Sequence, residues 1–158
     1  MRRLNRALLR KLTQLPPGEW LELLRAQASL VHAQVLVWTR ARGRLVAPAS
    51  KSCAFDRWSQ EPGATAVEPG VQRIALAIER AAAYGLFRPN CLVRALALHQ
   101  LLAGKGFRGS AVHAGARLEG GRFIAHAWVE YKGHVLGDPD WRVKKFAELG
   151  PMKLQEPS

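Results

Sequence analysis

Three residues of this chain have side chains that together can cleave an amide bond: Cys91, His126 and Asp138, in that order. A thiolate attacks a carbonyl carbon, an imidazole moves the proton, and a carboxylate holds the imidazole in the required tautomer. The local sequence predicts a helix start at Cys91, a strand around His126 and the end of the next strand before Asp138. The three residues therefore point to a thiol hydrolase.

Cys91 follows a residue that commonly begins helices. Asn90 is a favourable N-cap for a helix that we predict over residues 90–103. Free N–H groups and the helix dipole favour an anion at such a position, and hence a thiolate over a thiol. A buried structural cysteine is the alternative interpretation. Cys53 lies in a polar loop, and we take it as incidental.

His126 lies in a strand predicted over residues 122–131, between two alanines that leave space beside its ring. Side chains alternate along a strand, so His126 and Trp128 share one face. We expect Trp128, together with Asn90, to line the site, and Trp128 to exclude water from it. The alternative for His126 is a histidine that is hydrogen-bonded in the core.

Asp138 follows a short predicted strand and precedes Pro139, so its alternative is an ordinary turn residue. Asp140 is a competing candidate, and we prefer Asp138 because Asp140 lies beyond the bend at Pro139. A zinc site is a further alternative, with the ligands Cys91, His113, His126 and Asp138. The chain lacks Cys-x-x-Cys and His-Glu-x-x-His spacing, so we expect neither a metal nor another cofactor.

The periodicity of apolar residues predicts an α+β fold with N-terminal helices and an antiparallel sheet of at least three strands. Helices are predicted over residues 3–14, 17–42, 69–84 and 90–103, with Gly85 and Gly104 at helix ends, and a short helical turn near residues 55–58. Strands are predicted over residues 110–118, 122–131 and 134–136. We divide the chain into an N-terminal helical region (1–45), a linker (46–69) and a catalytic core (70–158), which together form one compact unit.

Composition supports a folded protein that keeps its thiols reduced. The chain has 158 residues, of which 48% are hydrophobic, and this length suits one domain with a core of its own. Two distant cysteines make no disulfide framework. The longest apolar stretch without charged residues, 26–39, is too short to cross a bilayer, and no signal peptide is evident. We expect a cytoplasmic protein.

The formal net charge is +12, and it is concentrated in the first part of the chain. Residues 1–60 hold 11 Lys and Arg against 3 Asp and Glu, whereas residues 61–158 hold 13 against 9. This charge is typical of an ordinary basic surface or of a protein with an acidic partner. No nucleic-acid-binding motif accompanies it, so we expect no nucleic-acid partner. For residues 3–14, a membrane-surface helix is an alternative interpretation.

Four segments resemble one family: residues 90–98, 104–107, 125–130 and 133–138. The motifs Cys-Leu-x-Arg-x-Leu-Ala-Leu and Ala-His-Ala-Trp-Val-Glu are similar to those of the transglutaminase-like leader peptidases of lasso peptide biosynthesis. The resemblance covers about residues 70–140. It implies a papain- or transglutaminase-like core in which Cys91, His126 and Asp138 form the catalytic triad.

The resemblance also implies a function and partners. These cysteine peptidases remove the leader from a ribosomally made precursor peptide, and a separate cyclase then closes the core peptide into a macrolactam. In split systems a small winged-helix-like protein recognises the leader. This chain starts directly with helices, so we expect a split-type enzyme whose partners are the precursor, the recognition protein and the cyclase. The alternatives are a transglutaminase-like acyltransferase and a non-enzymatic basic peptide-binding adaptor.

Overall fold

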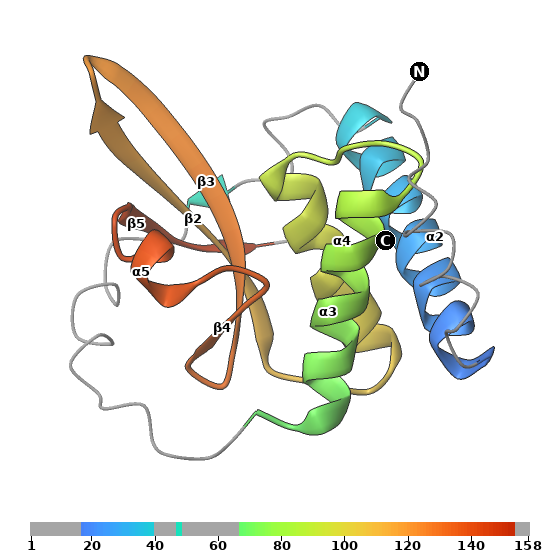
Figure 1. Cartoon of the computed structure of the whole chain (residues 1–158). Coiled ribbons are helices and arrows are strands. Elements are labelled where there is room, and N and C mark those ends of the chain that lie inside the picture. The colour runs from blue at the N-terminus through green and yellow to red at the C-terminus, as the bar shows by residue number, and fades with distance from the viewer. Residues whose placement is uncertain (1–16, 40–46, 49–66, 154–158) are drawn as a thin grey trace.

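A computed structural model describes residues 17–39, 47–48 and 67–153 of the chain. It confirms the α+β prediction: helices on one side pack against an antiparallel sheet (Figure 1). The helices are α2 (Pro17–Thr39), α3 (Pro69–Tyr84), α4 (Cys91–Gly104) and the short α5 (Asp140–Val143). The strands are β1 (Ala47–Pro48), β2 (Ser110–Glu119), β3 (Arg122–Tyr131), β4 (His134–Leu136) and β5 (Ala147–Lys153), in the sheet order β1-β5-β2-β3-β4.

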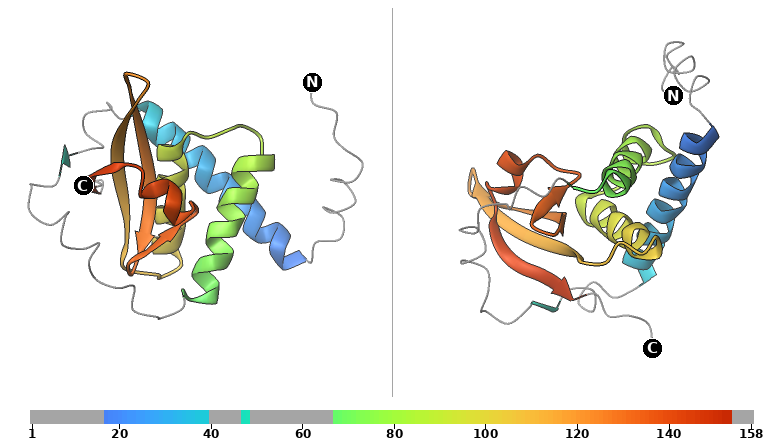
Figure 2. Two further views of the ribbon diagram at one scale, coloured as in Figure 1. Left: turned by 60° about the vertical axis from the view of Figure 1, so that its left-hand side comes forward. Right: turned by 90° about the horizontal axis from the view of Figure 1, so that it is seen from below.

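Helix α4 lies at the centre of the molecule, between the other long helices and the sheet (Figure 2). Its apolar residues share one core with α2, α3 and the strands, and Leu30, Ile78 and Val129 are each at most 2% exposed. Burial of such a side chain contributes about 1.5–3 kcal/mol. The hydroxyl of Ser29 donates to the Ala97 carbonyl at 2.9 Å, which joins α2 to α4 inside this core. The first residue of α4 is therefore held by packing on several sides.

The helix predictions are correct within the described residues, with one error at a helix end. Helix α3 has the predicted bounds, and Asn90 caps α4 as expected. The prediction that Gly104 follows the helix is wrong, because Gly104 is its last residue and Gly106 has φ +84°. Phe107 N donates to Leu102 O at 3.0 Å, which is the helix-ending pattern that requires a left-handed residue at Gly106. The predictions for residues 3–14 and 55–58 lie outside the described residues.

Two tight turns fix the register of the meander. Gly120 and Gly121 join β2 to β3, and Lys132 and Gly133 join β3 to β4. All four have positive φ, which matches the right-handed twist of the strands that they connect. The predicted strands β3 and β4 have the predicted bounds, and β2 extends one residue further, to Glu119.

The sequence analysis missed three elements, of which β5 matters most for the site. Strand β5 pairs with β2 and lies between β1 and β2 in the sheet. Its sequence contains Gly150 and Pro151, residues that usually interrupt strands, and this hides its periodicity. Helix α5 and strand β1 were missed because they have only four and two residues. None of the helices in the described residues is long and apolar enough to cross a membrane.

Candidate active site

Cys91 is the first residue of α4, and its thiol is free and partly exposed. The helix begins there because Asn90 supplies the cap: Val93 N donates to Asn90 Oδ1 at 2.9 Å. Capping satisfies one of the free N–H groups of the first turn and fixes the direction in which the chain enters the helix. Asn90 therefore positions Cys91 by forming this cap.

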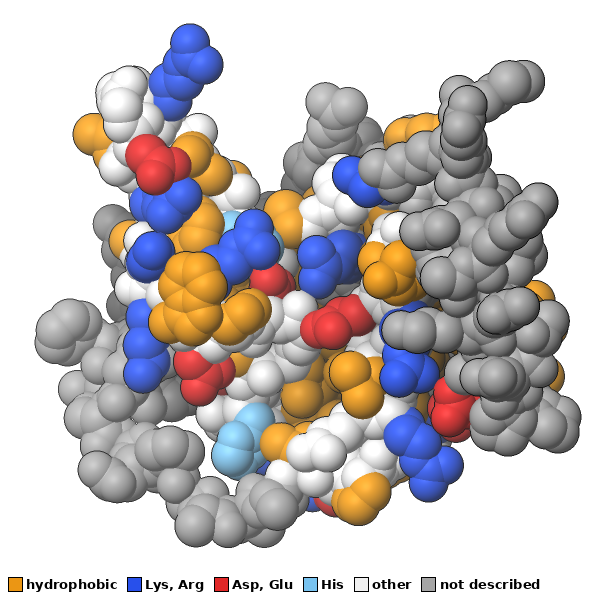
Figure 3. Space-filling view, viewed as in Figure 1, with side chains coloured by type: hydrophobic (Ala, Val, Ile, Leu, Met, Phe, Trp, Pro, Cys, Tyr) orange, Lys and Arg blue, Asp and Glu red, His pale blue; other side chains and the backbone are white. Residues whose placement is uncertain are grey.

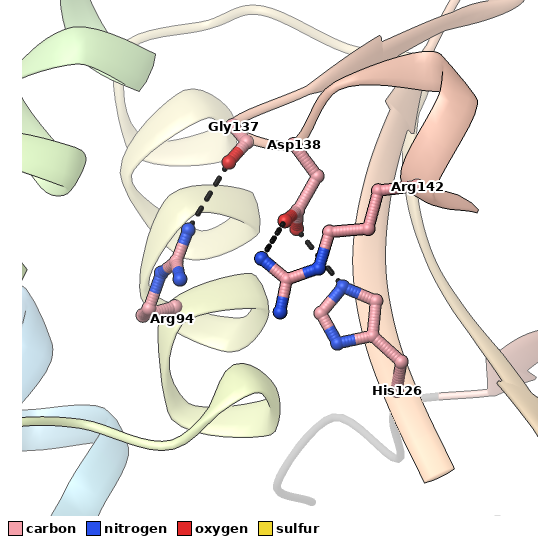
Figure 4. Close-up of polar contacts among 5 residues, drawn as sticks. All are labelled: Arg94, His126, Gly137, Asp138 and Arg142. Carbon is pink, nitrogen blue, oxygen red and sulfur yellow. Dashed lines mark hydrogen bonds and ion pairs between the residues drawn. The ribbon is translucent and has the colours of Figure 1, made fainter. Parts of the chain in front are cut away.

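His126 on β3 and Asp138 after β4 meet directly. His126 Nε2 lies 3.2 Å from Asp138 Oδ2, and each side chain is only 7% exposed (Figure 4). Because Nε2 is engaged by the carboxylate, Nδ1 is the ring nitrogen left for a second partner. Arg142 Nη1 lies 3.6 Å from the other carboxylate oxygen. Asp140, the competing candidate, begins α5 and is exposed.

Arg94 joins the helix of Cys91 to the loop of Asp138. Its Nη2 donates to the carbonyl of Gly137 at 3.1 Å (Figure 4). Gly137 has φ +77°, a conformation that glycine adopts without strain, and the loop thereby presents this carbonyl to α4. The sequence analysis included Arg94 in the motif over residues 90–98 but gave it no role. Its position one turn after Cys91 was the available signal.

Glu79 on α3 lies beside Arg94 and Asp138. Burial raises the pKa of the Glu79 carboxyl, Arg94 opposes this shift, and the charge of Asp138 adds to it. Glu79, Arg94 and Asp138 line the same small cavity beside Cys91, and the sequence analysis did not identify Glu79.

The ring of His126 packs against two other aromatic rings. Trp128 stacks beside it with a centroid distance of 6.3 Å, and Phe146 lies 5.1 Å away. His113, opposite Trp128 in the β2–β3 pairing, also stacks on the Trp128 ring at 6.0 Å. Trp128 is 2% exposed and lines a cavity of about 10 Å³ with Cys91 and Asp138. These contacts restrict the orientation of the imidazole and keep bulk water from the His126–Asp138 pair.

Gly115 makes this packing feasible. It lies opposite His126 in the β2–β3 pairing, at an irregularity in the β2–β5 pairing. A Cβ at this position would lie 2.9 Å from Phe146 Cβ and 3.0 Å from the Trp128 ring. Both aromatic residues therefore occupy space that a side chain at Gly115 would fill.

Cys91 and His126 open into one cavity of about 450 Å³. Cys91 at the tip of α4 and His126 on β3 both line this cavity. The remaining walls come from α4, the β2–β3 hairpin and the segment around α5: Arg94, Arg117, Ile124, Ala125, Trp141, Arg142, Lys145 and Phe146. A volume of this size accommodates several residues of a peptide. The structure thus places Cys91 and His126 on one cavity, and Asp138 is bonded to the His126 ring.

Three other histidines of the described residues have partners of their own. His113 Nδ1 contacts Glu148 at 2.5 Å, His99 contacts Ser110, and His32 contacts Gln100. Burial lowers the pKa of His99. In residues 17–39, 47–48 and 67–153, no three His, Cys, Asp or Glu side chains are arranged to hold a metal ion. His113, one of the four residues of the zinc alternative, pairs with Glu148.

Comparison with known proteins identifies the family. A family model described as "Transglutaminase-like superfamily" matches residues 28–150. The chain belongs to the transglutaminase-like superfamily. Members of this superfamily are generally cysteine enzymes, and membership indicates an activity of the cysteine peptidase or acyltransferase type. No individual curated protein and no solved structure matches the chain significantly.

Within a transglutaminase-like chain, the geometry around Cys91 has a clear chemical capacity. A thiol at a helix tip and an imidazole face one cavity, and a carboxylate holds the imidazole from behind. Such a set can form and hydrolyse a thioester. The roles of Cys91, His126 and Asp138 as a triad stay a prediction that mutagenesis can test.

Proposed function

We propose that this transglutaminase-like protein is a cysteine peptidase that removes the leader from a ribosomally synthesised precursor peptide. One observation supports the peptidase chemistry above all: Cys91 and His126 line the same cavity, and the ring of His126 is bonded to the buried Asp138. The similarity of residues 90–98 and 125–130 to lasso peptide leader peptidases supports the choice of substrate.

The reaction that we propose has two halves. In the first, Cys91 Sγ attacks the scissile carbonyl carbon, and His126 takes the thiol proton and passes it to the leaving amine. The C–N bond breaks, the core peptide leaves with a free amine, and the leader is held as a thioester. In the second half, water attacks the thioester, its proton goes to His126, and the thiol is restored with the leader carboxylate released.

Three features of the chain favour the charged intermediates of this reaction. Asp138 stabilises the imidazolium that forms when His126 accepts a proton. We propose the backbone N–H of Cys91 as one donor to the oxyanion, because N–H groups of a first helical turn are not used inside the helix. The aromatic rings of Trp128 and Phe146 reduce the dielectric around the imidazole, which strengthens its bond to the carboxylate.

We also propose that a separate leader-recognition protein delivers the precursor, and that the macrolactam-forming cyclase takes the released core peptide. The resemblance of residues 90–98 and 125–130 to lasso peptide leader peptidases supports this arrangement. A cytoplasmic location follows from the same proposal, because ribosomally made precursors and ATP-using cyclases occur there.

The decisive experiment compares wild type with Cys91→Ala on the precursor peptide, with and without the recognition protein. Hydrolysis gives two fragments whose masses sum to the precursor plus one water, and Cys91→Ala abolishes them while the circular dichroism spectrum is unchanged. Cys53→Ala serves as the matched control and retains cleavage. Iodoacetamide is expected to label Cys91 before Cys53. Fragments that persist in Cys91→Ala would contradict the proposal.

The same mass spectra separate the alternative functions. An acyltransferase would leave a crosslinked product in which an amine, and not water, has received the acyl group. A non-enzymatic adaptor would bind the precursor equally well in wild type and Cys91→Ala and would leave the precursor intact.

A further inference from the structure

The cavity above Cys91 has a strongly basic wall. Four cationic side chains line it, and among the described residues that line it none is acidic: Arg94, Arg117, Arg142 and Lys145. Figure 3 shows Lys and Arg side chains gathered around α5 and the neighbouring hairpin, next to hydrophobic side chains. The chemistry of Cys91 and His126 requires no such excess of positive charge, so the cations need a separate explanation.

Three of the four cations are already engaged within the protein. Arg94 donates to the Gly137 carbonyl at 3.1 Å, Arg117 pairs with Glu119 at 2.8 Å, and Arg142 faces Asp138 at 3.6 Å. These partners orient the three guanidinium groups, although the Arg142 side chain is still 52% exposed.

Lys145 differs from the arginines. Its Nζ lies 4.8 Å from the centre of the Trp141 ring, and it makes no ion pair with another described residue. Trp141 itself is 64% exposed and also lines the cavity. A lysine that is held over an exposed ring beside a nucleophile offers an ammonium group to a ligand, and the ring offers an apolar surface to the same ligand.

We infer that this cavity selects peptides that carry an acidic residue close to the scissile bond, and that Lys145 and Arg142 are the specificity-determining cations. This inference rests on the proposed peptidase function, because it names the substrate class of that same site. A carboxylate of the peptide lies between the two cations, and the adjacent main chain lies against Trp141. Arg117 on β2, over the Phe146 ring at 5.0 Å, also lines the cavity and adds positive potential.

The effect of one cation on an anionic ligand is measurable. When a cation and an anionic ligand lie about 7 Å apart in a medium as polar as water, the attraction between their unit charges changes a rate or binding constant by about threefold. Lower polarity within the cavity increases the effect, and added salt decreases it because the Debye length is about 8 Å at physiological ionic strength.

Alkylation of Cys91 tests the charge preference without any substrate. Iodoacetate and iodoacetamide form the same kind of bond, in which the sulfur displaces iodide from a CH₂ group, but only iodoacetate is anionic. Their rate ratio at Cys91, measured by peptide mass spectrometry, cancels any change in thiol reactivity that a substitution causes. We expect Lys145→Gln to lower the iodoacetate-to-iodoacetamide ratio about threefold at low salt. The neighbouring, exposed Lys144 does not line the cavity, so Lys144→Gln is the matched control and leaves the ratio unchanged.

A pair of peptides extends the test to the proposed ligand. Two rhodamine-labelled ten-residue Gly/Ser/Thr peptides differ only in having two Glu or two Gln residues at their centre. Fluorescence polarisation with Cys91→Ala is expected to show at least fivefold tighter binding of the Glu peptide, and Lys145→Gln removes most of this preference. Equal binding of the two peptides, together with an unchanged alkylation ratio in Lys145→Gln, overturns the inference. Neither measurement requires cleavage, so a failed cleavage assay counts against the proposed function alone.

Discussion

Replacement of Asp138 by Asn tests the arrangement of the site most directly. The side chain is 7% exposed and bonds to His126 at 3.2 Å, and Asn has the same shape without the charge. Arg142, 3.6 Å from the second oxygen, favours the amide oxygen on its own side and so turns the amide NH₂ toward His126. His126 Nε2 must then accept a hydrogen bond, and the proton moves to Nδ1. In that tautomer Nδ1, the ring nitrogen available to the Cys91 thiol, carries the proton and no longer acts as a base.

The expected loss follows from the strength of this bond. A hydrogen bond to a charged group contributes about 1.5–3 kcal/mol, more than a neutral one, and here both partners are shielded from water. If the whole contribution acts on the charged intermediate, kcat/KM falls by about 10- to 150-fold. The wrong tautomer adds to this loss, so the estimate is a lower bound.

The assay is cleavage of the precursor in the presence of the recognition protein, followed by mass spectrometry. Asp140→Asn is the matched control, because Asp140 is exposed and begins α5 only two residues away. We expect Asp140→Asn to keep at least half of the wild-type kcat/KM. If a folded Asp138→Asn protein cleaves within threefold of wild type, or if Asp140→Asn is equally impaired, the assignment of the orienting carboxylate is wrong.

Two further predictions concern stability. Gly115→Ala places a Cβ within 3.0 Å of Phe146 and the Trp128 ring, and we expect a loss of about 1–3 kcal/mol, or about 2–10 °C in Tm. Gly104→Ala, with no atom within 4 Å of the added Cβ, should leave Tm unchanged or raise it, and calorimetry that shows equal losses for both variants would contradict this account. Burial lowers the pKa of His99 below the usual 6.5, so the unfolded chain binds a proton first as pH falls and stability is lost below pH 6.5. His99→Gln should flatten this dependence of Tm on pH between 5 and 7, and an unchanged slope would refute the prediction.

The elements that carry Cys91, His126 and Asp138 were predictable because each has a local signal. Asn90 marks a helix start, the alternation around His126 marks a strand, and the Lys132–Gly133 turn places the next strand before Asp138. These signals depend only on neighbouring residues. They therefore give the order and type of the elements without any knowledge of the tertiary structure.

The surroundings of the three residues could not be predicted in the same way. Phe146 contacts His126 only because β5 pairs with β2, and Gly150 and Pro151 conceal that strand in the sequence. Likewise, nothing local to Gly137 shows that its carbonyl accepts from Arg94. Contacts between residues 20 to 43 positions apart depend on the sheet order, which periodicity does not encode.

The cations that could determine specificity were also not predictable from the sequence, because a charge count does not show which cations lie near the site. By count, the N-terminal part of the chain holds most of the excess positive charge, yet among the described residues the cations that line the cavity of Cys91 come from α4, β2 and the segment around α5. Net charge decides long-range attraction of an acidic partner, whereas selection near the scissile bond depends on the few cations within a Debye length of the reacting atoms. If Lys145 provides that selection, salt should weaken substrate preference and substrate capture to different extents, because the two effects act over different distances.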